Sequence, residues 1–207
     1  MICDLIWDVD GTLFDTYPAI AQAMMLALGE LGGEAPPEHV DRLCKVSFGH
    51  AVAVLAEACA VDADALFAGF YRCLDALPVE DQRPFPGVAA LCEHVLSIGG
   101  GNFIITHRHR ASLERLLAAH TMRGYFVDAV TGDDGFPRKP DPTGLNALIA
   151  RNGIRREQAL VIGDRGLDVA AAHAAGVRAC FFGTNPHLEP AEFEVLDYAT
   201  LLRLLRK

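Results

Sequence analysis

The sequence predicts an α/β fold, a doubly wound parallel sheet with a helical segment inserted after its first strand. Short apolar segments of strand length alternate with helical patterns from residue 84 onward, whereas residues 16–83 show helical patterns throughout. Helices that join consecutive strands require a parallel sheet. Carboxylate or hydroxyl residues follow three of these strands, as expected where ligands bind at the carboxyl ends of parallel strands.

The first predicted strand is the apolar run 2–7, which ends at Asp8. The helix predicted for residues 18–31 ends at Gly32-Gly33, a typical stop signal, and Pro36-Pro37 begins the next helix. Two further helices are predicted for residues 51–60 and 63–77, and Asp62 is a suitable N-cap for the latter. The segment 84–87, which contains two prolines and a glycine, marks the return to the sheet.

The remaining predicted strands comprise residues 102–105, 129–131, 159–162 and 178–182. The predicted helices of this part comprise residues 88–97, 110–120, 143–152, 167–175 and 200–205. We expect the last of these helices to pack on the edge of the sheet.

Composition narrows the class of protein. The chain has 207 residues, 51% of them hydrophobic and 22% charged, enough for one large domain or a domain with an insertion. Its formal net charge of −9 argues against nucleic acid or an anionic membrane as partner. It does not argue against small anionic substrates, because local groups and a metal set the field in a cleft.

Several features predict a cytoplasmic protein. No basic region precedes the first strand, so we expect no signal peptide. No apolar stretch approaches the roughly 20 residues needed to span a bilayer. The six cysteines are scattered and form no CxxC pair, which favours free thiols in a reducing compartment.

The most informative segment is DVDGTLFDT, which begins at Asp8 directly after the first strand. Side chains alternate along a strand, so Asp8 and Asp10 would point to the same side. Two carboxylates held together repel each other, and a divalent cation such as Mg²⁺ bound to their oxygens relieves the repulsion. The alternative is a simple β-turn at Asp10-Gly11.

Three further short motifs follow along the chain. Thr106 comes directly after the strand 102–105, Lys139 lies in the proline-containing loop 138–142, and Asp164 follows the strand 159–162. Together with DxDGT, this order resembles the four motifs of the haloacid dehalogenase (HAD) superfamily. The closest resemblance is to its type I helical-cap subgroup, with phosphoglycolate phosphatase-like and β-phosphoglucomutase-like members. Each motif alone is short, whereas four in this order are specific.

The resemblance implies a role for each motif residue. Asp8 would be the nucleophile that forms an aspartyl-phosphate, and Asp10 the general acid and base. Asp8, Asp10 through its backbone carbonyl, and Asp164 would bind Mg²⁺, because hard oxygen ligands suit this ion. Thr106 would hydrogen-bond a phosphoryl oxygen, and Lys139 would neutralise Asp8 and the transferring phosphoryl group.

Two residues near Asp164 have less certain roles in this scheme. Asp168 lies one helical turn further on and could orient Asp164 or Lys139, or it could charge the first turn of its helix. Arg165 departs from the family pattern, in which a small hydroxyl residue is common, and we expect it to pair with an acid or to cover the pocket.

The resemblance also implies a division of the chain. Residues 1–15 and 84–207 would form the HAD-like α/β core, and residues 16–83 the helical cap. Candidates for contact with the substrate are Tyr17, Lys45 and His50 in the cap, and His107 and Arg108 after Thr106. The alternative is that these residues belong to an ordinary polar helix face or a solvated loop.

We therefore expect a Mg²⁺-dependent phosphomonoester hydrolase that acts on a small phosphorylated metabolite, as a monomer or small homo-oligomer. A phosphomutase of the β-phosphoglucomutase type would use the same motifs. A metal-free 2-haloacid dehalogenase is disfavoured because it has no need of Asp10. A phosphonate hydrolase would need a Schiff-base lysine in the cap, where Lys45 is the sole lysine. A non-catalytic binding protein on the same fold is the remaining alternative.

Overall fold

The computed structural model describes residues 1–185 and 189–206, and the chain divides into two compact units. The α/β unit comprises Met1–Asp15 and Arg83–Lys207, and the helical unit comprises Thr16–Gln82. Arg83, which the sequence assigned to the helical segment, belongs to the α/β unit. Its carbonyl accepts a hydrogen bond of 2.8 Å from the Asp15 N–H.

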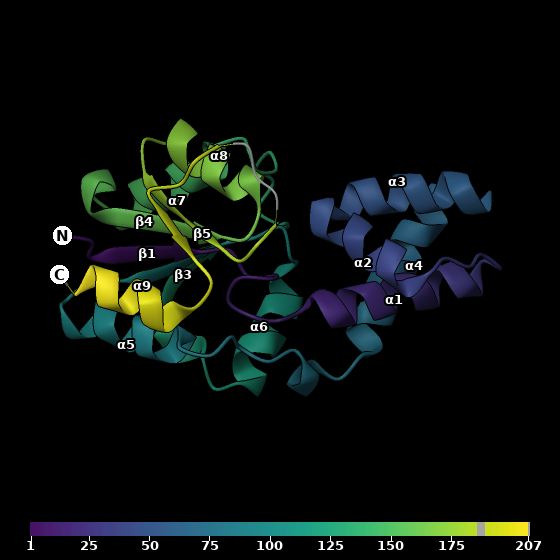
Figure 1. The fold of residues 1–207 in the computed structure, drawn as a ribbon, viewed down its shortest axis with the longest axis horizontal. Coiled ribbons are helices and arrows are strands. Elements are labelled where there is room, and N and C mark those ends of the chain that lie inside the picture. Colours follow the sequence, from purple (N-terminus) through teal and green to yellow (C-terminus); the bar gives the residue numbers. More distant parts are fainter. Residues whose placement is uncertain (186–188, 207) are drawn as a thin grey trace. The chain divides into compact units, whose positions relative to one another are not determined.

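The α/β unit contains a six-stranded sheet with the order β3-β2-β1-β4-β5-β6, in which every neighbouring pair is parallel (Figure 1). The sheet confirms the predicted fold class. The order reverses between β1 and β4, which makes their carboxyl ends the topological switch point. The strands are β1 (Asp4–Trp7), β2 (Asn102–Ile105), β3 (Phe126–Val130), β4 (Ala159–Gly163), β5 (Arg178–Phe182) and β6 (Phe193–Val195).

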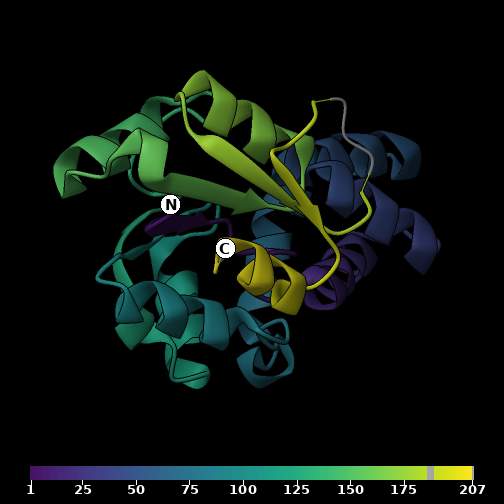
Figure 2. The same ribbon diagram turned by 60° about the vertical axis from the view of Figure 1, so that its left-hand side comes forward.

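Helices cover both faces of this sheet (Figures 1 and 2). Helices α7 (Thr143–Asn152) and α8 (Gly166–Ala174) pack on one face, and α5 (Val88–Ser97) and α9 (Tyr198–Leu205) pack together on the other. Because side chains alternate, Ile6 enters the core under α7 and α8, whereas Trp7 contacts Tyr198 on the opposite side. The remaining elements of this unit are α6 (Arg110–Ala119) and two single 3₁₀ turns, Arg123–Tyr125 and Arg156–Gln158.

The C-terminal part differs most from the prediction. Strand β6 was missed, because a three-residue segment with a central glutamate carries no strand signal and forms through its pairing with β5. Helix α9 begins earlier than predicted, at Tyr198, because the Asp197 carboxylate caps it by accepting the Thr200 N–H at 2.7 Å. It contacts α5 as well as β6 and so covers part of a face rather than only the edge.

Strand β3 also differs from its prediction, since it begins at Phe126 and ends before Thr131. The Thr131 N–H donates to the Asp134 carboxylate at 2.7 Å, which turns the chain away from the sheet. As an edge strand, β3 has carbonyls that pair with no further strand. Arg123 donates to that of Phe126, and Arg110 and Arg151 both donate to that of Ala129. These guanidinium groups protect the edge from pairing with another chain.

The helical unit has its own hydrophobic core, to which all four of its α-helices contribute. Asp62 caps the fourth helix as predicted, by accepting the Ala65 N–H at 2.8 Å. The third helix begins three residues earlier than predicted because Ser47 caps it. The α-helices are α1 (Tyr17–Glu30), α2 (Pro37–Val46), α3 (Phe48–Cys59) and α4 (Ala63–Ala76), followed by the 3₁₀ turn Val79–Asp81.

Among the residues that the structure describes, no helix combines the length and the apolar character needed to cross a membrane.

Tyr198 connects the last helix to the loop that follows Asp10. Its ring is fully buried, lies edge-on to Trp7 and stacks on Phe182. Its hydroxyl donates a hydrogen bond of 2.7 Å to the carbonyl of Thr12. A buried carbonyl that loses its donor costs free energy, so this bond supports the geometry of the DxDGT loop.

We expect Tyr198→Phe to lower the free energy of unfolding by about 1–2 kcal/mol, because the Thr12 carbonyl loses its buried donor. Urea denaturation followed by the fluorescence of Trp7, the chain's single tryptophan, measures the loss. Tyr125→Phe is the matched control, because the Tyr125 hydroxyl bonds the exposed Glu93 carboxylate. Equal effects of the two substitutions would contradict the assignment.

Candidate active site

Three polar side chains follow three adjacent strands at the switch point of the sheet. Asp8 follows β1, Thr106 follows β2 and Asp164 follows Gly163 at the end of β4, and all three are buried. The strand pairing aligns these positions, since Trp7 lies opposite both Ile104 and Ile162. The structure therefore brings together residues that are far apart in the sequence, as the strand-end argument predicted.

The Asp8 carboxylate contacts a cation on each of its oxygens. The Lys139 Nζ donates to Oδ1 at 2.8 Å, and the Arg165 Nη2 donates to Oδ2 at 3.3 Å. Burial by itself would raise the pKa of Asp8, but the charges of Lys139 and Arg165 outweigh it and hold the pKa below its ordinary value. Asp8 is thus an ionised carboxylate at neutral pH.

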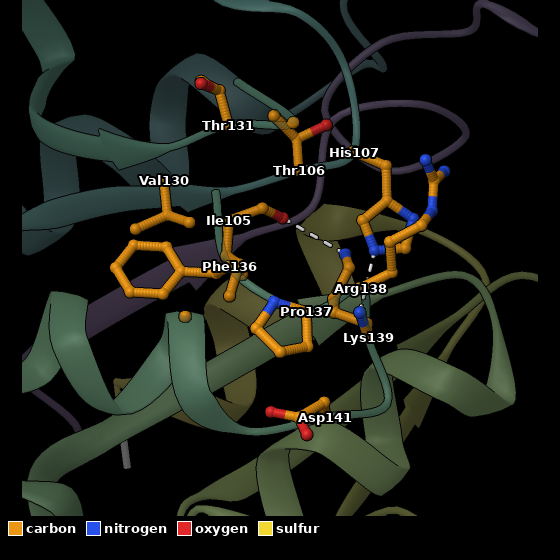
Figure 3. Close-up of a pocket in the computed structure, with 12 residues that line it drawn as sticks. Ile105, Thr106, His107, Val130, Thr131, Phe136, Pro137, Arg138, Lys139 and Asp141 are labelled. Atoms are coloured by element: carbon orange, nitrogen blue, oxygen red, sulfur yellow. Dashed lines mark hydrogen bonds between the residues drawn. The ribbon is translucent and has the colours of Figure 1, made fainter. Parts of the chain in front are cut away.

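Lys139 reaches this carboxylate from the loop before α7. Its Nζ also contacts the Asp168 carboxylate at 2.5 Å and donates to the carbonyl of Ile105 at 3.1 Å (Figure 3). Burial would lower the pKa of Lys139, but Asp168 and Asp8 raise it above its ordinary value, so the ammonium keeps its charge. One buried cation therefore joins the carboxylate that follows β1 to a carboxylate in the first turn of α8.

Asp164 is held by neutral donors. The Thr12 hydroxyl donates to Oδ1 at 3.2 Å, and the Asn185 side-chain amide donates to Oδ2 at 3.3 Å and to the backbone carbonyl at 3.1 Å. Neither Thr12 nor Asn185 was singled out from the sequence. The threonine of DxDGT was a usable signal for Thr12, whereas Asn185 follows the last residues of β5 and belongs to no motif.

The carboxylates that could share a metal ion, among the described residues, are those of Asp8, Asp164 and Asp168, whose nearest oxygens lie within 4.8 Å of one another. The predicted metal ligands were Asp8, Asp164 and the backbone carbonyl of Asp10, and the last of these stays a prediction. Hard carboxylate oxygens without a sulfur or imidazole ligand suit Mg²⁺. Asp8 and Asp168 both contact Lys139, and the Asp168 carboxylate also accepts the backbone N–H of Arg165, so we take Asp8 and Asp164 as the candidate carboxylates for an ion.

Asp168 and Arg165 are coupled through the start of α8. The Asp168 carboxylate accepts the Arg165 N–H at 3.2 Å as part of a capping box, which is one of the two roles considered for Asp168, and it also contacts Lys139. A Cβ on Gly163 would lie 2.3 Å from the Cβ of Asp168, which explains the glycine at this strand end. Arg165 departs from the family pattern, and we expected it to pair with an acid or to cover the pocket. In the structure it pairs with Asp8.

Arg108, which we predicted as a substrate contact, points toward Asp10 in the structure. Its guanidinium is buried and faces Asp10, with Nε 3.1 Å and Nη2 2.5 Å from Oδ1. The sequence placed Arg108 in an open basic loop, because nothing local indicates that its partner lies 98 positions away.

His107 also has a contact that the sequence did not indicate. Its Nε2 accepts the backbone N–H of Lys139 at 2.9 Å (Figure 3). Burial, together with the charges of Lys139, Arg138 and Arg165, lowers the pKa of His107 to about 2. The imidazole is therefore neutral and anchors the Lys139 loop, rather than acting as a cation for an anionic substrate.

A small pocket lies beside this site, between the ends of β2 and β3 and the loop before α7 (Figure 3). Its cavity of about 40 Å³ has room for only a few water molecules. Thr106, His107 and Lys139 form part of its wall, together with Thr131, Phe136 and Arg138. The pocket is too small for a metabolite, so we assign no ligand to it.

The three candidates in the helical unit have ordinary structural contacts there. Tyr17 is buried in the first turn of α1. Lys45, in α2, pairs with Asp41 at 2.8 Å and lies over the Tyr17 ring at 5.7 Å from its centre. His50 is exposed in the first turn of α3, and its backbone N–H donates to the Ser47 Oγ at 3.1 Å. Whether these residues meet a substrate stays a prediction.

We expect Lys139→Met to lower the free energy of unfolding by about 3–5 kcal/mol, because it removes the cation shared by two buried carboxylates. Lys45→Met is the matched control. Lys45 also lies 2.8 Å from an aspartate, but both side chains are more than one-third exposed, at 38% and 36%. An exposed pair of this kind contributes less than about 1 kcal/mol. Chemical denaturation followed by circular dichroism measures both, and similar losses would contradict the central role of Lys139.

Comparison with known proteins gives a consistent family. The family model described as haloacid dehalogenase-like hydrolase matches residues 5–182. A phosphoglycolate phosphatase from Rhodospirillum rubrum is 31% identical over 183 residues, which cover 84% of this chain and 76% of that protein. The crystal structure of a hydrolase from Streptococcus pneumoniae is 28% identical, covers 100% of this chain and 99% of that chain, and has a TM-score of 0.64.

A second solved structure agrees in fold. The structure of a predicted phosphoglycolate phosphatase from Haemophilus somnus covers 99% of this chain and 98% of its own, with a TM-score of 0.83 and 20% identity. The match of the family model over most of the chain, and the identity to the Rhodospirillum rubrum protein, confirm the resemblance inferred from the four motifs. The chain belongs to the haloacid dehalogenase-like hydrolases.

Proposed function

We propose that the protein is a Mg²⁺-dependent phosphomonoester hydrolase that acts on a small phosphorylated metabolite through an aspartyl-phosphate. The observation that carries this proposal is the Asp8 carboxylate, which is buried at the switch point and kept ionised by Lys139 and Arg165. A nucleophilic carboxylate must be ionised and fixed in place to attack phosphorus.

In the first step, an oxygen of Asp8 forms a bond to phosphorus while the bond from phosphorus to the leaving oxygen breaks. Asp10 gives its proton to the leaving oxygen, and the product alcohol departs. In the second step, Asp10 takes a proton from water as the water oxygen attacks phosphorus. The bond between phosphorus and Asp8 then breaks, which releases inorganic phosphate and restores both aspartates.

The remaining charged groups stabilise the transferring phosphoryl group. Lys139 and Arg165 place two positive charges at the Asp8 oxygens. The same charges can stabilise the negative charge on the phosphoryl oxygens during transfer. The Thr106 oxygen accepts the N–H of Arg108 at 3.1 Å, so its own hydroxyl proton is available for a phosphoryl oxygen. This arrangement supports the role that the family resemblance implies for Thr106.

The donor set at the site fits Mg²⁺. Asp8 and Asp164 would hold the ion, together with the backbone carbonyl of Asp10. Thr12 and Asn185 fix the orientation of the Asp164 carboxylate. When bound, the ion would offset the repulsion between Asp8 and a dianionic phosphate.

The identity of the metabolite depends on residues outside the four motifs. The motif residues recognise the phosphoryl group, which all phosphomonoesters share, so other residues must select the leaving group. We assign this role to the helical unit, with Tyr17, Lys45 and His50 as its candidate residues. Phosphoglycolate is the first substrate to test, because the relative from Rhodospirillum rubrum is a phosphoglycolate phosphatase.

We expect release of inorganic phosphate from phosphoglycolate or another small phosphorylated acid or sugar, and at least about a thousandfold loss of kcat in Asp8→Asn, because an amide is a poor nucleophile. A panel of phosphorylated metabolites, assayed for free phosphate and for isomerised sugar phosphate, measures both. Near-wild-type turnover by a folded Asp8→Asn protein would refute the covalent mechanism. Isomerisation without release of phosphate would indicate a phosphomutase.

We expect activity to disappear in EDTA and to return with Mg²⁺, but poorly with Ca²⁺, whose looser coordination misplaces the attacking carboxylate. Binding is measured separately from activity. Mg²⁺ at about 100 times its Kd should raise the free energy of unfolding by about 2.7 kcal/mol. Asp164→Asn should abolish this gain, whereas the control Asp41→Asn, at an exposed carboxylate, should keep it. Full activity in EDTA would instead favour metal-free chemistry.

A further inference from the structure

Arg108 holds Asp10 and Ser112 at the same time. Its Nε and Nη2 contact the Asp10 carboxylate, and its Nη1 donates to the Ser112 Oγ at 2.8 Å. The Arg108 side chain is 4% exposed and the Asp10 side chain 22% exposed. All three guanidinium nitrogens are thus engaged within the fold. Nε and Nη2 both lie close to Oδ1, and Nε lies 3.4 Å from Oδ2, so the planar group contacts both carboxylate oxygens.

The backbone of Arg108 is fixed as well. Its N–H donates to the Thr106 Oγ at 3.1 Å, and its carbonyl accepts the Gly132 N–H at 2.9 Å. A Cβ on Gly132 would lie 2.5 Å from the carbonyl of His107, so the two loops meet in close contact. The guanidinium therefore extends from a rigid base, and a rigid base gives it a defined direction toward Asp10.

Orientation matters for the chemistry assigned to Asp10. A general acid must present its proton along the line to the leaving oxygen, and a carboxylate that rotates freely loses part of this advantage. A guanidinium that contacts both carboxylate oxygens restricts that rotation, and the bond from its Nη1 to Ser112 holds the guanidinium itself in place.

We propose that Arg108 is a positioning residue for Asp10, which fixes the carboxyl group that protonates the leaving oxygen. This inference rests on the proposed function, because it requires Asp10 to be the general acid. It replaces the expectation that Arg108 reads the substrate. It predicts that the effect of Arg108 depends on how much the leaving group needs a proton.

The test compares two leaving groups in single turnover. The rate of alcohol release from glycerol phosphate depends on protonation, whereas dinitrophenolate departs from dinitrophenyl phosphate without it. We expect Arg108→Ala to slow release of glycerol by about 10- to 100-fold and release of dinitrophenolate by less than about 3-fold. Measuring the first release separates this step from hydrolysis of the aspartyl-phosphate.

Further variants make the test specific. Arg108→Lys keeps the charge and is more conservative for folding, but a single ammonium cannot bridge Asp10 and Ser112, so it should show the same selectivity. Adding Arg108→Ala to Asp10→Asn should cause no further selective loss, because both act on one group. Arg110→Ala is the matched control, since Arg110 lies two residues after Arg108, at the start of α6, but pairs with Asp134, and it should leave both rates unchanged.

The outcomes distinguish this inference from the proposed function. Equal slowing of both substrates by Arg108→Ala and Arg108→Lys would overturn the positioning role, as would a change in KM alone. If Asp10→Asn slows release of glycerol more than release of dinitrophenolate and the Arg108 variants slow both equally, the inference fails and the proposed function stands. If Asp10→Asn itself lacks selectivity, the general-acid assignment fails and the inference fails with it. Retained activity in Asp8→Asn would refute the proposed function at an earlier step.

Discussion

The site depends on the balance between three buried carboxylates and two cations at the ends of β1 and β4. Asp8 and Asp168 share Lys139, and Arg165 lies near both of them and 3.9 Å from Asp164. Like charges at these distances in a partly dry site repel strongly, so the cluster is stable only with its cations. When all three carboxylates are ionised, three negative and two positive charges leave one net negative charge within the cluster, which a divalent cation can offset.

The fold produces this cluster through several short-range constraints. The parallel register aligns the strand ends, Gly163 lets the start of α8 approach the sheet, and Asp168 caps that helix while it faces Lys139. The neutral His107 imidazole anchors the Lys139 loop through a backbone N–H. Each of these groups therefore supports the fold and also positions a residue of the site, so we expect substitutions here to affect stability and activity together.

Local signals in the sequence accounted for much of the fold and for the residues at the strand ends. Helices α5 and α7 and strands β2 and β5 have the predicted bounds. The signals that predict them, hydrophobic periodicity and glycine stops, depend only on residues close together in the sequence. Strand β6 and the contacts of Arg108 and Asn185 were missed for the opposite reason. Each depends on a partner from a distant segment, and neither a three-residue strand nor a single arginine reveals that partner.

The two aspartates of the DxDGT motif have unequal surroundings, and this inequality divides their roles. Asp8 is 2% exposed and has a cation on each oxygen, so it is held as an anion away from bulk water. Asp10 is 22% exposed and is held by one guanidinium, so its carboxylate is closer to solvent while its direction stays fixed. The proposed function assigns these two chemically identical side chains different roles, a nucleophile and an acid, and the surroundings of the two carboxylates differ in the sense that these roles require.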